Sequence, residues 1–233
     1  MELTLNITDN NDNLANYTTI GFFGQKGSGK TVALKMAAEQ FRQQQYPCII
    51  FDALGNFKVK GYKQITNIRT DNANKLGQVM NEKWLILDLS KLTTKDLVMV
   101  ADGICRFMLN NKRSSAVIID EIGDYLPQSR ATYAAEMERL IRVGRNYGQL
   151  PVLFASQRPQ KVDKNVVGLA DYYIFLRLQH YLDRDVAKRT MAVNNKEAWE
   201  SMEADLMNFK TRECYTYGYD FAEPIKTTTK KHG

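Results

Sequence analysis

The sequence has few of the residues that build metal centres and disulfide frameworks. Its 233 residues include only three cysteines and two histidines, and Cys48, Cys105 and Cys214 lie far apart without a C-x-x-C pair. We therefore do not expect a zinc site made of thiolates and imidazoles. Scattered cysteines are typical of small buried side chains in a reducing compartment, so we expect these three in the core of an intracellular protein.

Long apolar runs and linkers are missing as well. No stretch approaches the roughly 18 apolar residues that a membrane span needs, and residues 1–5 lack the basic residues that begin a secretion signal. We expect a soluble protein that does not itself span a membrane. Because the chain has no Pro/Gly/Ser-rich linker, we expect one domain, over residues 18–222. An N-terminal strand and polar loop over 1–17 precede it, and a basic, flexible tail over 223–233 follows it.

The charge of the chain permits a polyanionic partner but does not require one. The net charge is +6 and the isoelectric point is about 9.1. A basic balance of this size suits contact with nucleic acid, yet many basic proteins have no such partner. Hydrophobic residues make up 44% of the chain, enough for one substantial core.

Short apolar runs alternate with amphipathic stretches along the chain. Continuous apolar runs indicate strands that are buried on both faces, and they occur at residues 18–23, 48–51, 84–88, 116–119, 151–155 and 172–178. Helices are predicted over 31–45, after the capping box at Thr93–Asp96, and beyond Pro127; a weak hairpin is predicted near 207–217. This alternation predicts an α/β fold with a mostly parallel central sheet and helices on both faces.

A phosphate-binding loop follows the first apolar run. Its glycines let backbone N–H groups curl around a triphosphate, and the next helix directs its N-terminal dipole at the anion. Lys30 is positioned for the β- and γ-phosphates of ATP, and the Thr31 hydroxyl for Mg²⁺. The eight residues fit G-x-x-x-x-G-K-[ST] at every fixed position and are Gly24, Gln25, Lys26, Gly27, Ser28, Gly29, Lys30 and Thr31.

Two acidic residues end a later strand. Asp120 and Glu121 follow the run at 116–119, so they should lie at the carboxyl edge of the sheet, where open α/β folds bind ligands. There Asp120 would hold Mg²⁺ through water and Glu121 would act as general base toward the attacking water. The alternative is a solvated helix N-terminus, whose dipole also favours acidic residues.

Two further features complete a possible hydrolytic site. Gln157 lies one strand further on, where its amide could sense the γ-phosphate or orient the water; the alternative is a turn set by Pro159. Three arginines recur at every third residue of the helix after Pro127, and one of them could reach a neighbouring subunit's nucleotide as an arginine finger. The alternative is surface charge, and the spacing favours none of Arg139, Arg142 and Arg145.

These motifs together resemble the FtsK/HerA superfamily of DNA-pumping ATPases. The resemblance extends over about residues 18–192, and the stretch from the arginine-glycine segment at 144–150 to S-Q-R-P at 156–159 is more diagnostic than the phosphate loop. It implies a RecA-like P-loop NTPase fold, ATP and Mg²⁺ as cofactors, double-stranded DNA as partner, and a homo-oligomeric ring, commonly a hexamer. It also implies that Gln157 is the sensor and Arg145 the finger. The stretches that carry it are 49–56, 120–122, 144–150 and 153–159.

Within that superfamily, the small ATPase domain without membrane segments is similar to the genome-packaging ATPases of tailless viruses with an internal membrane. That similarity implies packaging of a viral genome into a preformed capsid. It also implies contact with capsid or packaging-vertex proteins, in the cytoplasm of an infected host cell or at a virion vertex. The alternative is a Zot-like phage assembly factor, which normally has a transmembrane segment, or an ATP-dependent switch that pumps no DNA.

A DNA pump needs basic residues along its DNA path. The candidates are Lys58, Lys60 and Lys63, interleaved with Phe57 and Tyr62, because lysines bind phosphates and aromatic rings stack on bases. Solvated loop charge is the alternative interpretation. Two more candidates follow the S-Q-R-P stretch, Lys161 and Lys164.

Overall fold

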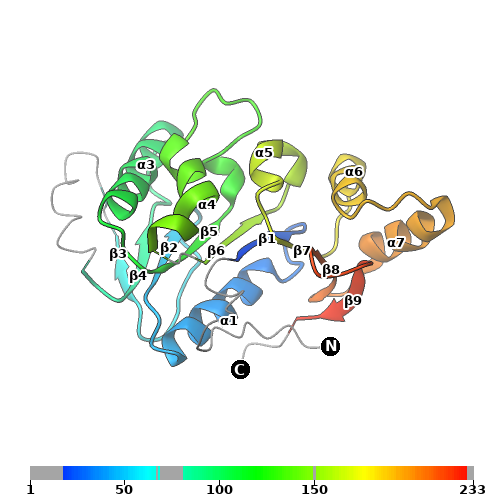
Figure 1. The fold of residues 1–233 in the computed structure, drawn as a ribbon, viewed down its shortest axis with the longest axis horizontal. Helices are drawn as coiled ribbons and strands as arrows, with labels where there is room; N and C mark the ends of the chain where they lie inside the picture. Colours follow the sequence, from blue (N-terminus) through cyan, green and yellow to red (C-terminus); the bar gives the residue numbers. More distant parts are fainter. Residues whose placement is uncertain (1–17, 67, 69–80, 149–150, 230–233) are drawn as a thin grey trace.

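One nine-stranded sheet runs through the part of the chain that the computed structural model describes, residues 18–66, 68, 81–148 and 151–229 (Figure 1). For Arg145, Tyr147 and Gly148 only the backbone is described. The strand order is β3-β4-β2-β5-β6-β1-β7-β8-β9. The strands are β1 (Thr19–Phe23), β2 (Cys48–Asp52), β3 (Lys63–Ile65), β4 (Trp84–Asp88), β5 (Ala116–Asp120), β6 (Val152–Ser156), β7 (Tyr172–Phe175), β8 (Glu213–Gly218) and β9 (Ile225–Thr228).

Strands β1 to β7 are mutually parallel, and β8 and β9 are added in antiparallel pairings. The four strands β1, β2, β5 and β6 are buried over their whole length. Burial on both faces explains why each reads as a continuous apolar run rather than an alternating one. All six strands predicted from such runs are present, which confirms the mostly parallel α/β fold.

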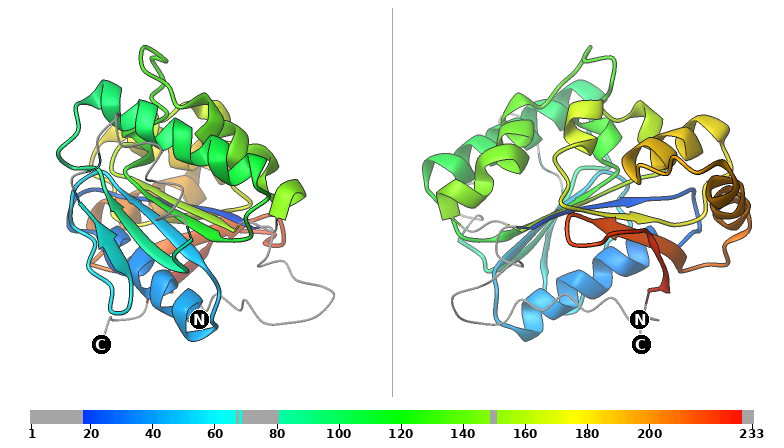
Figure 2. Two further views of the ribbon diagram at one scale, coloured as in Figure 1. Left: turned by 90° about the vertical axis from the view of Figure 1, so that its left-hand side faces the viewer. Right: turned by 45° about the vertical axis from the view of Figure 1, so that its right-hand side comes forward.

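Helices cover both faces of the sheet. One face is covered by α1 (Lys30–Gln43), whose Leu34, Ala38 and Phe41 pack in an apolar cluster with β1, β2 and β5. The other face carries α3 and α4 in Figure 2, with α5 and α6 continuing the layer in Figure 1. These helices are α3 (Thr94–Asn110), α4 (Ala135–Gly148), α5 (Lys164–Val167), α6 (Tyr181–Thr190) and α7 (Lys196–Asn208).

The predicted capping box begins α3. The Thr93 hydroxyl accepts a hydrogen bond from the N–H of Asp96 at 3.3 Å and donates one to the Asp96 carboxylate at 2.7 Å. The first turn of the helix is thereby satisfied locally. Ile104 and Met108 on the predicted apolar face are buried.

Several sequence-based expectations differ from the structure. β3 was not predicted, because a three-residue strand with two exposed positions has no apolar pattern. The hairpin consists of β8 and β9, later than residues 207–217, since α7 extends to Asn208. The expected flexible tail does not begin at residue 223, because Ile225–Thr228 pairs with β8. The strand and polar loop expected within 1–17 lie outside the described residues.

The three cysteines are buried free thiols, as expected for small core side chains. Burial raises the pKa of all three thiols, that of Cys48 to about 12. None of the described helices is both long enough and apolar enough to cross a bilayer.

Candidate nucleotide-binding site

The phosphate-binding loop connects β1 to α1 at the carboxyl edge of the sheet. Gly27 (φ +77°) and Gly29 (φ +111°) occupy the left-handed region, which glycine adopts without steric cost. A Cβ at Gly24 would lie 2.6 Å from Ser28 Oγ and 2.9 Å from Leu176 Cβ, so this position also requires glycine. Ser28 is fully buried, and its hydroxyl has no hydrogen-bond partner among the described residues.

Lys30 is buried inside this loop. Only 6% of the residue is exposed, and its ammonium group donates to the carbonyl oxygens of Gly24 and, at 3.1 Å, Gln25. Burial lowers the pKa of Lys30, while the carboxylates of Glu121 and Asp120 act in the opposite direction. The structure therefore brings both predicted acidic residues within electrostatic reach of the loop lysine.

Asp120 ends β5 and is 2% exposed. Its Oδ2 has no hydrogen-bond partner among the described residues. Burial, together with the neighbouring carboxylates of Glu121 and Asp52, raises the pKa of Asp120 to about 6, against the opposing effect of Lys30. A buried carboxylate oxygen without a donor fits a hydrated Mg²⁺ ion, which prefers oxygen ligands.

Glu121 is held in a defined position by the next strand of the sheet. It has a left-handed backbone (φ +51°), which is unfavourable for a residue with a side chain. Its Oε1 accepts hydrogen bonds from Ser156 Oγ at 3.0 Å and from the N–H of Gln157 at 3.1 Å. The general-base candidate is thus oriented by the end of β6, which lies between β5 and β1.

Gln157 contributes to this arrangement through its backbone. The expectation concerned its side-chain amide, which is half-buried, whereas the hydrogen bonds to Glu121 come from its N–H. The neighbouring Arg158 pairs with the buried Asp183 of α6 at 2.9 Å. Arg158 therefore fixes the segment after β6 against α6.

The arginines of α4 lie on a helix that starts near the carboxyl edge and returns to the amino edge, where β6 begins. Arg139 pairs with Glu136 at 3.3 Å, and Arg142 is exposed. Arg145 lies ten residues after Ala135, about 15 Å along the helix axis. Its backbone is therefore far along α4 from the edge that carries the phosphate loop; its side chain lies outside the described residues.

Three lysines proposed for the DNA path lie after β2 and beside α1, and the last of them, Lys63, begins β3. Lys58 and Lys60 are exposed, but Lys63 pairs with Glu82 at 2.6 Å. Phe57 is fully buried, so it cannot stack on bases as an interleaved aromatic ring. Tyr62 is half-buried and donates to the carbonyl of Ala38 at 2.7 Å. All three lysines of this group are exposed, but only Lys58 and Lys60 form no ion pair with another described residue.

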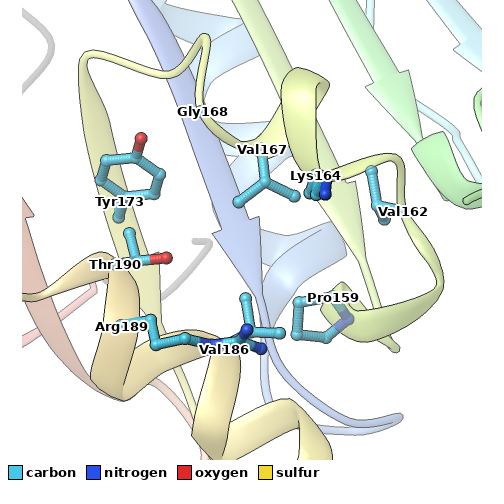
Figure 3. A pocket seen from close by; sticks show the side chains of 9 residues that line it. All are labelled: Pro159, Val162, Lys164, Val167, Gly168, Tyr173, Val186, Arg189 and Thr190. Atoms are coloured by element: carbon cyan, nitrogen blue, oxygen red, sulfur yellow. The ribbon is translucent and has the colours of Figure 1, made fainter.

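The two lysines after the S-Q-R-P stretch have different surroundings. Lys161 ends the short 3₁₀ helix Pro159–Lys161 and is exposed. Lys164 lies on the wall of a cavity of about 310 Å³ between α5, β7 and α6. Figure 3 shows it beside the apolar side chains of Val162 and Val167.

Sequence reasoning assigned no role of their own to two residues that support the site. Ser156 was noted as part of a motif, but its hydrogen bond to Glu121 depends on strand neighbours 35 positions apart. Asp52 lies beside Asp120 in the β2–β5 register, and its carboxylate accepts three backbone N–H bonds from residues 54–57. An acidic residue at the end of an apolar run was the available signal for Asp52.

One family of known proteins matches the N-terminal part of the chain. Residues 13–71 match the family described as the Type IV secretion-system coupling protein DNA-binding domain. A search of curated protein sequences returned no match. The matched segment includes the phosphate loop, α1 and β2.

Among solved structures, the chain is similar to the genome packaging NTPase B204 of Sulfolobus turreted icosahedral virus 2 in complex with ATP-gammaS. The TM-score is 0.68 at 14% identity, over 93% of this chain and 99% of that one. It is also similar to VirB4 of Thermoanaerobacter pseudethanolicus, with a TM-score of 0.65 at 12% identity over 92% of this chain and 89% of that one. The similarity to the pCW3 conjugation coupling protein TcpA with ATPgS has a TM-score of 0.61 at 13% identity, over 91% of this chain and 60% of that one. The chain therefore has the RecA-like α/β fold of P-loop ATPases, which is the fold that the sequence resemblance implies.

Proposed function

We propose that the chain is an ATP-driven translocase of double-stranded DNA. The observation that carries this proposal is the convergence of three motifs: the buried Lys30 of the phosphate loop, the unpartnered Oδ2 of Asp120, and Glu121 oriented by β6. A phosphate cradle, a metal ligand and a positioned base are the parts that NTP hydrolysis requires.

The phosphate loop binds the triphosphate of ATP. Backbone N–H groups of residues 24–31 surround the phosphates, and the Lys30 ammonium moves from the carbonyls of Gly24 and Gln25 to the β- and γ-phosphates. Thr31 and Asp120 would hold Mg²⁺, which neutralises charge on the phosphates when bound. The raised pKa of Asp120 favours the same arrangement, because a cation would relieve the cost of its buried charge.

Glu121 is the general base. Its carboxylate is fixed by Ser156 and by the N–H of Gln157, so it is pre-oriented toward a water at the γ-phosphate. These two hydrogen bonds also prevent the side chain from turning to solvent. In this role Ser156 and Gln157 are positioning residues.

Arg145 acts on a neighbouring subunit. Its backbone lies far along α4, away from the phosphate loop of its own chain. In a homo-oligomeric ring, commonly a hexamer, its guanidinium would instead reach the nucleotide that the adjacent subunit binds. A guanidinium at the γ-phosphate neutralises the charge that develops during transfer. ATP hydrolysis in each subunit then depends on its neighbour.

Double-stranded DNA is the proposed cargo. Support comes from the match to a coupling-protein DNA-binding domain, the likeness to a genome packaging NTPase, and the net charge of +6. We propose that the cargo is a viral genome entering a preformed capsid in the cytoplasm of an infected cell. The basic contacts would come from Lys58 and Lys60, with capsid or packaging-vertex proteins as further partners.

Hydrolysis by Glu121 is tested with two variants and a control. Lys30→Ala should lose ATP binding, because the loop loses its phosphate contact. Glu121→Gln should bind ATP like the wild type but hydrolyse it at least about a hundredfold more slowly, as expected for loss of a general base. Glu197→Gln, an exposed position on α7, should behave like the wild type. Normal turnover by Glu121→Gln would refute the assignment of the base.

A further inference from the structure

The segment between α7 and β8 is attached to the phosphate loop, although the two are far apart in the sequence. The N–H of Arg212 donates to the carbonyl oxygen of Ser28 at 2.9 Å. Beside it, Thr211 Oγ1 lies 3.5 Å from the carbonyl oxygen of Gly27. The segment that leads into β8 thus lies directly against the phosphate loop.

Arg212 has a backbone conformation that glycine would adopt more readily. Its φ is +80°, in the left-handed region that side chains disfavour. The conformation is fixed from both sides, because the N–H of Arg212 bonds to Ser28 and its carbonyl oxygen accepts from the N–H of Thr229 at 2.9 Å. Strained conformations that surrounding contacts enforce are concentrated at ligand sites.

The side chain of Arg212 starts directly against Gly29. Its Cγ would lie 3.2 Å from a Cβ built on Gly29, the residue that caps α1. The N–H groups at this point of a phosphate loop face the phosphates nearer the nucleoside, whereas the loop lysine serves the β- and γ-phosphates. Arg212 is half-buried and forms no ion pair with any residue that the structure describes.

We propose that Arg212 is a further nucleotide-binding residue, whose guanidinium contacts the α- and β-phosphates that ATP shares with ADP. This inference rests on the proposed nucleotide-binding function of the phosphate loop. A guanidinium binds phosphate oxygens through two parallel N–H donors. Because the contact is the same before and after hydrolysis, it contributes to affinity and leaves the chemical step unchanged.

The test compares the wild type with three variants, Arg212→Ala, Arg212→Gly and Lys210→Ala. For each protein, calorimetry measures the affinities for ATP and ADP, and steady-state kinetics measure KM and kcat for ATP hydrolysis. Arg212→Gly keeps a backbone suited to φ +80° and removes the guanidinium, so it separates binding from folding. Lys210→Ala removes an exposed charge from the same segment and serves as the matched control.

Both Arg212 variants should bind ATP and ADP about tenfold more weakly and show a KM raised by a similar factor, the size expected for one charge-assisted contact, with kcat nearly unchanged. Lys210→Ala should match the wild type. Wild-type affinity in Arg212→Gly, or a loss confined to ATP, would overturn the inference. Wild-type protein that binds neither nucleotide would instead overturn the proposed function itself, so the two failures are distinguishable.

Discussion

Replacing Asp120 with asparagine should stabilise the nucleotide-free protein at neutral pH. The pKa of Asp120 in the folded chain is about 6, against an ordinary value of 3.8, with burial as the largest cause. Between these values the folded state holds a proton that the unfolded state has released, so the stability of the wild type falls as pH rises through this window. A difference of about two pKa units corresponds to about 3 kcal/mol of destabilisation at pH 7.

Asp120→Asn removes this titration. The wild type should lose about 3 kcal/mol of unfolding free energy between about pH 4 and pH 7 from this group, and the variant should not. Urea denaturation without nucleotide or Mg²⁺, repeated across this pH range, measures the difference. The variant should at the same time lose ATP hydrolysis if Asp120 holds Mg²⁺ as proposed, because a neutral amide is a weaker Mg²⁺ ligand than a carboxylate.

A second carboxylate, that of Asp205, serves as a control because its effect on stability changes with pH in the opposite direction. Burial alone would raise the pKa of Asp205, but hydrogen bonds from Lys226 and Tyr215 lower it overall. Its contribution to stability is therefore present at neutral pH and lost on acidification, so Asp205→Asn should be less stable than the wild type at pH 7. Unfolding curves of Asp120→Asn and wild type that keep a constant separation from pH 4 to pH 7 would refute the reasoning about Asp120.

Three further predictions concern turnover and DNA binding. Ser156→Ala removes a hydrogen bond to Glu121, so kcat should fall about tenfold at unchanged ATP affinity; an unchanged kcat would contradict its positioning role. In mixtures of Arg145→Ala with wild type, ATPase activity should deviate from proportionality to the wild-type fraction, whereas strict proportionality would argue against a finger shared between subunits. Replacing both Lys58 and Lys60 by alanine should weaken DNA binding and lower the slope of log affinity against log salt by about two; equal slopes would exclude both lysines from the DNA path.

The core of the fold could be predicted because its strands are buried on both faces. Cys48–Asp52 and Ala116–Asp120 are continuous apolar runs that end in an acidic residue, and burial on both sides leaves that pattern in the sequence. Edge strands leave no such pattern. The two edge strands are short and partly exposed. For this reason Lys63–Ile65 was not predicted, and Ile225–Thr228 was expected to belong to a flexible tail.

The candidate site was predictable to the extent that each motif is local. The phosphate loop and Asp120–Glu121 are recognisable because their chemistry needs adjacent residues. The contacts that orient them are not local: Ser156 reaches Glu121 across neighbouring strands, and Arg212 reaches Ser28 from the other end of the chain. Such contacts depend on strand order, which no short pattern in the sequence specifies.

The most direct test of DNA translocation is ATP-driven displacement of a third-strand oligonucleotide from a DNA duplex. Wild-type protein with ATP and Mg²⁺ should displace the oligonucleotide, and the time before displacement should increase with the length of duplex that separates it from the entry end. Glu121→Gln should bind both DNA and ATP without displacing it. ATP hydrolysis by the wild type with no displacement, at any duplex length or protein concentration, would contradict a DNA motor.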